Sequence, residues 1–170
     1  MVRIKVVNQP VARVQTDVLA LGIFQDVRPL QGPSEEVDWI FGGLLSRLIL
    51  NGKFRGLSGE TVLLATQSKL PASKVLVLGL GNRDPFDLKA LIGACRLTLE
   101  KIRSLNARRC VMELYGVLDR PIDIQQAMGE IMTVMRDDPS SQGLDLSLLV
   151  SNSNKAHQAQ QYLLAASVTV

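Results

Sequence analysis

The sequence predicts an α/β protein in which a mixed, mostly parallel central sheet lies between two layers of helices. Segments with the apolar pattern of strands alternate with segments that have the apolar spacing of helices, which is typical of this three-layer architecture. One strand segment is apolar throughout, as in a strand covered on both faces. The length of 170 residues, with 46% hydrophobic and 21% charged residues, allows a sizeable core. We therefore expect one domain over residues 1–170.

Two strands are predicted at the start of the chain. Val2–Val7 alternates valine and isoleucine with basic side chains, the period of a strand with one buried and one solvated face. This pattern favours a peripheral strand. Val18–Phe24 is a continuous apolar run that follows Asp17 and is expected to form a central strand.

A helix is predicted to begin at Pro33–Glu36. The Ser34 hydroxyl can accept a hydrogen bond from a free backbone amide, and the two glutamates favour the positive end of the helix dipole. Apolar residues follow at helical spacing, at Val37, Phe41, Leu44, Leu45 and Leu48. Asn51–Gly52 is expected to end the helix. Gly42–Gly43 lies inside it, at a cost of about 1 kcal/mol per glycine relative to alanine, and is interpreted as permitting close packing on a neighbour.

Thr61–Thr66 and Lys74–Leu80 are predicted to be two strands. The segment between them is too short for a helix, so we expect the pair to be antiparallel. Asp87–Asn106 has the clearest amphipathic pattern of the chain and is predicted to be a helix. The remaining predicted elements are a strand at Cys110–Tyr115, a helix at Asp123–Met135, a strand at Leu144–Val150 and a helix at Asn154–Ala166.

Composition excludes several classes of protein. The longest apolar runs, such as Val75–Leu80, are far shorter than the roughly 20 residues of a membrane helix, and no basic and apolar leader opens the chain. A soluble cytoplasmic protein is therefore expected, with no membrane partner. The formal charge of +3 is a small excess over a mixed surface and does not indicate nucleic acid. Cys95 and Cys110 lie in apolar segments and are interpreted as reduced core residues.

The segment Gly79, Leu80, Gly81 and Asn82 is the candidate ligand-binding loop. It follows a strand and precedes a helix, where an α/β sheet exposes backbone amides that can cradle a phosphate. The third glycine of a dinucleotide fingerprint and the lysine of a phosphate-binding loop are absent. A tight turn between a strand and a helix is the alternative interpretation.

A basic stripe is the candidate nucleic-acid surface. Lys89, Arg96 and Arg103 lie seven residues apart, along one side of the predicted helix. Glu100 lies within four residues of both arginines, as in a salt-bridged solvated surface, and aromatic residues for base stacking are missing. Nucleic acid is therefore a disfavoured partner.

No catalytic constellation is apparent in the sequence. His157 is the only histidine and lies in a polar terminal segment. The paired acids at Glu35–Glu36 and Asp137–Asp138 fall in a first helical turn and in a loop, so neither pair is expected to be desolvated. No catalytic residue, metal ligand or cofactor is predicted from these residues.

Several segments, most of which contain glycine, resemble one family in their order and spacing. They are Thr16–Ala20, Phe41–Leu48, Gly52–Gly56, Gly59–Thr61 and Lys74–Gly81. Together they resemble the amino-terminal domain of leucyl aminopeptidases, the M17 family of metallopeptidases. The resemblance covers most of residues 1–150 and is strongest over 41–106. It implies a macro-domain-like fold.

The same resemblance implies that this domain does no chemistry. In the family, the two divalent metals and the catalytic residues belong to a separate carboxy-terminal domain, and neither of the motifs that carry the metal ligands occurs in this chain. The sequence also departs from the family at Met132–Asp137, where an aromatic-rich segment usually stands.

Three hypotheses about function follow from the resemblance. The first is a stand-alone, non-catalytic relative that acts in binding, regulation or assembly, with a second copy or a separate protein as partner. The second is a binder or hydrolase of ADP-ribose-like nucleotides, although only Asp17 and Asp26 lie near the early strand to recognise an adenine. The third is a DNA-binding accessory protein that uses the basic stripe.

Overall fold

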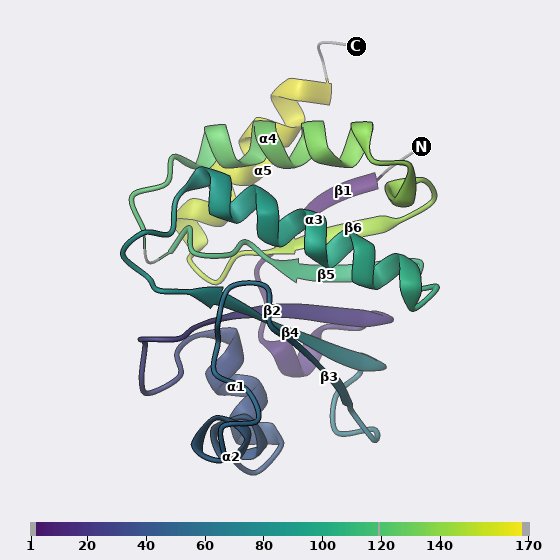
Figure 1. The fold of residues 1–170 in the computed structure, drawn as a ribbon. Helices are drawn as coiled ribbons and strands as arrows, with labels where there is room; N and C mark the ends of the chain where they lie inside the picture. The colour runs from purple at the N-terminus through teal and green to yellow at the C-terminus, as the bar shows by residue number, and fades with distance from the viewer. Residues whose placement is uncertain (1–2, 119, 168–170) are drawn as a thin grey trace.

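Six strands form one sheet in the computed structural model, which describes residues 3–118 and 120–167. The strand order is β1-β6-β5-β2-β4-β3, and every neighbouring pair is parallel except β3 and β4, which are antiparallel (Figure 1). The strands are β1 (Arg3–Val7), β2 (Val18–Phe24), β3 (Thr61–Ala65), β4 (Lys74–Gly81), β5 (Arg109–Glu113) and β6 (Asp145–Leu149). The mixed, mostly parallel sheet, the edge position of β1 and the interior position of β2 are confirmed. The expected start at Val2 lies outside the described residues.

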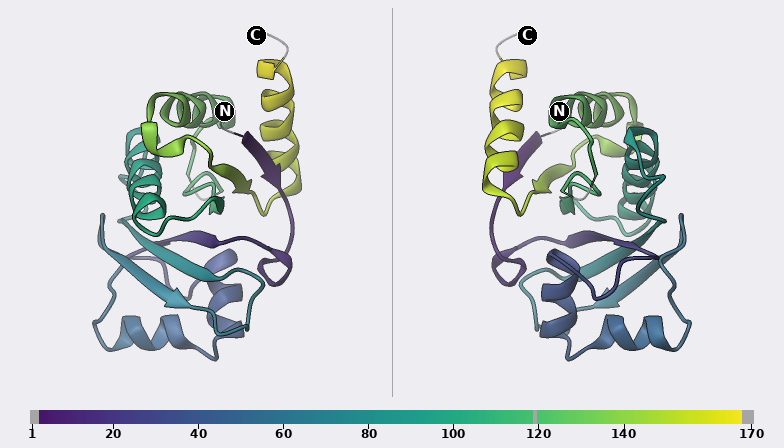
Figure 2. Two further views of the ribbon diagram at one scale, coloured as in Figure 1. Left: turned by 90° about the vertical axis from the view of Figure 1, so that its right-hand side faces the viewer. Right: turned by 90° about the vertical axis from the view of Figure 1, so that its left-hand side faces the viewer.

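Helices cover both faces of this sheet. Over the described ranges they are α1 (Pro33–Ile40), α2 (Leu44–Leu50), α3 (Leu88–Ser104), α4 (Ile124–Asp137) and α5 (Ser153–Ser167). The layer of α3, α4 and α5 lies on one face, and α1 and α2 lie on the other (Figures 1 and 2). Two short 3-10 helices, η1 (Val11–Arg13) and η2 (Pro139–Ser141), complete the fold. The sequence did not predict them, because three residues are too few to show a periodicity.

The continuous apolar run of β2 follows from burial on both faces. Leu19 and Leu21 belong to the core beneath α1 and α2, whereas Ala20 and Phe24 belong to the core beneath α3 and α4. Successive side chains of a strand point to opposite faces, so an interior strand of a three-layer fold must be apolar at every position.

Cys95 and Cys110 are free, buried thiols in the core on the α3 and α4 side of the sheet, as the sequence predicted. Burial raises the pKa of the Cys95 thiol to about 12 and also raises the pKa of Cys110. Both thiols therefore stay protonated at neutral pH and pack as small apolar groups.

The single helix predicted from Pro33 to Asn51 is wrong, because α1 ends at Ile40 and α2 begins at Leu44. Gly42 and Gly43 lie between them with φ of +61° and +81°. Residues in this left-handed region cannot continue a right-handed helix. A β-carbon on Gly42 would contact nothing within 4 Å, and one on Gly43 would meet only the end of the Arg47 side chain at 3.5 Å, so the predicted close packing at this glycine pair is wrong as well.

The capping role predicted for Ser34 is also wrong. Gly32 is the residue that precedes the first turn of α1, and the Ser34 hydroxyl donates to the Gln31 carbonyl at 2.9 Å. Pro33 occupies the first helical position, where a missing N–H costs nothing. The side chain that caps a helix here is Asp38, which accepts from the backbone N–H of Ser46 at 3.1 Å in the first turn of α2.

Candidate functional site

The crevice at the carboxyl ends of β2 and β5 is the position where an open α/β sheet usually binds ligands. The chain leaves β2 toward α1 on one face of the sheet and leaves β5 toward α4 on the other (Figure 1). These two adjacent parallel strands therefore define the point at which the connections diverge.

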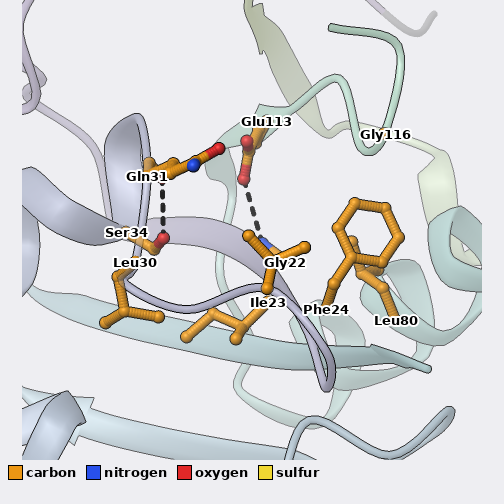
Figure 3. Close-up of a pocket in the computed structure, with 10 residues that line it drawn as sticks. Gly22, Ile23, Phe24, Leu30, Gln31, Ser34, Leu80, Glu113 and Gly116 are labelled. Atoms are coloured by element: carbon orange, nitrogen blue, oxygen red, sulfur yellow. Dashed lines mark hydrogen bonds between the residues drawn. The ribbon is translucent and has the colours of Figure 1, made fainter. Parts of the chain in front are cut away.

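The polar groups of this crevice are paired within the protein. The Glu113 carboxylate, at the end of β5, accepts from the backbone N–H of Gly22 in β2 at 3.0 Å (Figure 3). Gln31 and Ser34 lie on the opposite wall and are joined by the hydrogen bond described above. The space left among these groups is about 40 Å³. That volume suits a water molecule or two, whereas ligand pockets measure roughly 300–1,000 Å³.

Two aromatic rings pack beside the crevice. Phe24 and Phe86 form an edge-to-face pair with ring centroids 5.2 Å apart. A β-carbon on Gly116, after β5, would lie 2.4 Å from the Phe86 ring, and one on Gly22 would lie 2.6 Å from Leu80. The glycines that could open the crevice are thus covered by neighbouring side chains.

Tyr115 packs against Gly22 from the core, where a β-carbon on Gly22 would lie 2.9 Å from its ring. Its hydroxyl shares a 2.8 Å hydrogen bond with the Thr98 hydroxyl, and the side chain is fully buried. Burial raises the pKa of Tyr115 well above its usual value, more than the hydrogen bond from Thr98 lowers it. The phenol is therefore neutral and acts as a packed structural group.

The predicted ligand loop at Gly79 to Asn82 begins inside β4, where its glycine amides are already bonded to protein. The Gly79 N–H donates to the Glu60 carbonyl at 2.7 Å, and the Gly81 N–H donates to the Gly56 carbonyl at 2.9 Å. The segment that precedes β3 thus lies along the end of β4 as an added strand would. A phosphate at this loop could not use either glycine amide without breaking these bonds.

The other two residues of the loop have different surroundings. Leu80 is buried and lines the crevice, and the Asn82 side chain accepts from the Gln25 amide at 2.6 Å. Asp26 accepts from the Arg83 N–H at 2.9 Å, so this nearby carboxylate also holds the turn after β4. Ligand binding by Gly79, Leu80, Gly81 and Asn82 stays a prediction.

The glycine-rich segment before β3 binds the carboxylate of Glu60, a residue of the same segment. One carboxylate oxygen of Glu60 accepts from the backbone N–H groups of Arg55, Gly56 and Leu57, at 2.9, 2.9 and 3.1 Å. Successive amides that converge on one oxygen form a nest, which is an anion-binding arrangement. Gly56 has φ of +82°, and this allows the nest to form. Gly56 and Glu60, which belong to the segments that resemble the family, therefore have a structural role.

The basic stripe is only partly assembled. Arg96 and Arg103 lie on an exposed face of α3, where Glu100 and Asp138 share the same shallow depression. Lys89 lies further along the helix and does not line this depression. Two carboxylates beside two guanidinium groups reduce the positive potential that a phosphate backbone needs. DNA binding by Lys89, Arg96 and Arg103 stays a prediction.

The described residues also bear on three other expectations from the sequence: the metal centre, His157 and the membrane. The metal centre of the aminopeptidases named by the resemblance needs clustered ligands, and no group of three or more His, Cys, Asp or Glu is gathered within residues 3–118 and 120–167. Those residues do not fit such a centre. His157 is exposed on α5, where its ring lies 3.4 Å from Gln161. None of the described helices has the length and apolar content needed to span a membrane.

The most exposed large apolar side chains among the described residues lie in the layer of α1 and α2, on the face of the sheet opposite to α3, α4 and α5. Trp39 is 86% exposed and Leu50 is 84% exposed. Trp39 borders an open groove of about 900 Å³, which is much larger than the closed crevice. Sequence reasoning missed this surface because Trp39 is two residues from Val37 and falls outside the apolar stripe. A tryptophan on the polar face of an amphipathic helix was the available signal.

Solved structures with the same architecture define the class of the fold. A macrodomain of Trypanosoma brucei in complex with ADP matches with a TM-score of 0.73 and 17% identity, over 95% of this chain and 69% of that one. A macrodomain of Oceanobacillus iheyensis with ADP matches with a TM-score of 0.71 and 14% identity, over 97% and 92%. The chain therefore has the macrodomain fold.

Within this class the chain belongs to the cytosol aminopeptidase family, whose N-terminal domain model matches residues 20–137. It is 29% identical over 115 residues to a probable cytosol aminopeptidase of Alkaliphilus metalliredigens, and 34% identical over 116 residues to one of Thermosynechococcus vestitus. The matches cover 68% and 67% of this chain but 23% of each relative. A tomato leucine aminopeptidase mutant matches in fold with a TM-score of 0.67 and 19% identity, over 95% of this chain and 35% of that one. The resemblance found in the sequence is confirmed.

Proposed function

We propose that this chain is a non-catalytic docking module of the cytosol aminopeptidase family, acting in assembly or regulation in the cytoplasm. The observation that carries the proposal is the exposure of Trp39 and Leu50 on one layer of the fold. Large apolar side chains left in water on neighbouring elements are typical of surfaces that bind other proteins. Tryptophan is also the residue type most enriched among energetically important interface contacts.

The use of the carboxylates inside the domain supports the same proposal. Glu113 binds the Gly22 amide, Glu60 binds three amides of the nest, and Asp17 forms an ion pair with Arg109 at 2.8 Å. Each of these acids stabilises a backbone segment at a defined place. A general base would instead need an approach for a substrate proton, within about 3 Å of its oxygen.

The non-catalytic half of the proposal is tested by measuring hydrolysis of leucine p-nitroanilide by the purified chain, with Mn²⁺ or Zn²⁺ added. We expect no rate above that of buffer and metal, while a cytosol aminopeptidase of full length assayed beside it turns over. Metal-dependent turnover that co-purifies with the chain through two orthogonal columns would contradict the proposal.

A further inference from the structure

The groove beside Trp39 carries negative charge around an exposed indole. Glu35, Glu36 and Asp38 line it together with Trp39 and Ile40. The Glu36 carboxylate accepts from the Val11 N–H at 3.0 Å, and Asp38 accepts from Ser46 as described. These donors are neutral, so they leave the charges in place. None of the three acids takes part in an ion pair within the part of the chain that the structure describes.

Arg47 lies at the edge of the groove, but it forms no ion pair with Glu35, Glu36 or Asp38 among the described residues. The Arg47 guanidinium donates to the Gly42 carbonyl at 2.6 Å, at the turn between α1 and α2. Glu35 is exposed, and its carboxylate has no hydrogen bond in the described structure. Glu35 and Trp39 are four residues apart on α1, so they lie on one side of the helix, one turn from each other.

A carboxylate beside an exposed indole is a suitable binding site for a guanidinium group. A guanidinium group can stack on the face of an indole and donate to a carboxylate at the same time. Lysine presents a compact and strongly hydrated ammonium, which matches the flat ring less well. Ile40 adds an apolar wall to the groove, so apolar residues beside the arginine would also be buried.

We propose that the groove at Glu35 and Trp39 binds an arginine of a partner protein that is flanked by apolar residues. The inference rests on the proposed docking function and names the chemistry of the partner. A second copy of the chain also carries exposed arginines, such as Arg13 and Arg55, so it is the alternative occupant that the test must exclude. The negative charge of the groove favours an occupant that presents an arginine, and the concentration dependence of the Trp39 emission distinguishes a partner protein from a second copy.

The chain contains a built-in reporter for this site, because Trp39 is its only tryptophan. Tryptophan fluorescence therefore monitors the groove alone. The probe is the acetylated and amidated peptide Ala-Leu-Arg-Leu-Ala, titrated into the full chain. We expect saturable quenching or a blue shift, with a dissociation constant on the order of 1 mM or below. The same peptide with citrulline in place of arginine keeps the shape but loses the charge, and should bind about tenfold more weakly.

Variants locate the binding. Glu35→Gln should weaken binding of the arginine peptide about threefold to tenfold, and high salt should weaken it as well. The matched control is Glu130→Gln, which removes an exposed carboxylate of α4 on the other face of the sheet and should leave the affinity unchanged. Both side chains are exposed, so neither change should unfold the chain.

Three results would overturn the inference. The first is no saturable change at millimolar arginine peptide, and the second is equal binding of the citrulline peptide. The third is a Trp39 emission that shifts with protein concentration alone, because a second copy would then occupy the groove. None of these requires hydrolytic activity, so the inference can fail while the assay with leucine p-nitroanilide still supports a non-catalytic module.

Discussion

Replacing Gly79 with alanine is expected to abolish cooperative folding or to destabilise the chain by more than about 4 kcal/mol. A β-carbon at this position would lie 2.0 Å from the Leu57 carbonyl oxygen and 2.6 Å from the Gly56 carbonyl carbon. Both neighbours are backbone atoms and cannot rotate away. The segment is also held by hydrogen bonds from the Gly59 N–H to the Gly79 carbonyl and from the Gly79 N–H to the Glu60 carbonyl.

Urea unfolding followed by circular dichroism measures this effect. The matched control is Gly93→Ala, because Gly93 lies inside α3 and the added methyl group would have no neighbour within 4 Å. That variant should gain about 0.5–1 kcal/mol, since alanine is the better helix former. An unfolding free energy of Gly79→Ala within about 1 kcal/mol of the parent would show that the segment at Gly56 does not lie against β4 as described.

Replacing Asp17 with asparagine is expected to cost about 1–2 kcal/mol at neutral pH. The carboxylate accepts from the backbone N–H groups of Arg108 and Arg109, at 3.1 and 2.9 Å, and from the Arg109 guanidinium at 2.8 Å. It therefore joins the start of β2 to the start of β5. Partial burial raises the pKa of Asp17, but the hydrogen bonds and charge of Arg109 and the Arg108 amide lower it further, so the net pKa lies below its usual value.

The sign of the pH dependence follows from that lowered pKa. The native chain holds the Asp17 proton less tightly than the unfolded chain, so the stabilisation is complete above the unfolded pKa of about 3.9. It is lost as the pH falls through the native pKa. The difference between the parent and Asp17→Asn should therefore be constant from pH 6 to 7 and shrink below about pH 4. If the loss of stability in Asp17→Asn did not change with pH, the result would contradict the role of the ionised Asp17 carboxylate. Asp137→Asn, at an exposed ion pair, should change stability by less than about 0.5 kcal/mol.

The sheet was predictable because the burial of a strand or helix determines which of its neighbouring positions are apolar, and this pattern can be seen in the local sequence. An interior strand such as β2 must be apolar on both faces, and the helical spacing in α3 extends over several turns. The break between α1 and α2 was missed because the apolar spacing continues across Gly42–Gly43, and glycine alone does not reveal the sign of φ.

The closed crevice could not be predicted, because it depends on contacts between distant segments. Glu113 and Gly22 are 91 positions apart, and the Gly79 amide meets a carbonyl in a loop before β3. The sequence shows which residues could supply an amide or a carboxylate, but not which of them bind each other. The same limit applies to Trp39, whose exposure depends on where α1 packs on the sheet.

Calorimetric titration with ADP-ribose tests most directly whether the protein's own side chains close the crevice. The neighbours of known structure include macrodomains with ADP bound, so the fold as such permits a nucleotide. Because about 40 Å³ remains around Glu113, we expect no heat beyond dilution and no thermal shift at millimolar ADP-ribose. Saturable binding with a dissociation constant of about 0.1 mM or tighter would contradict the closed crevice.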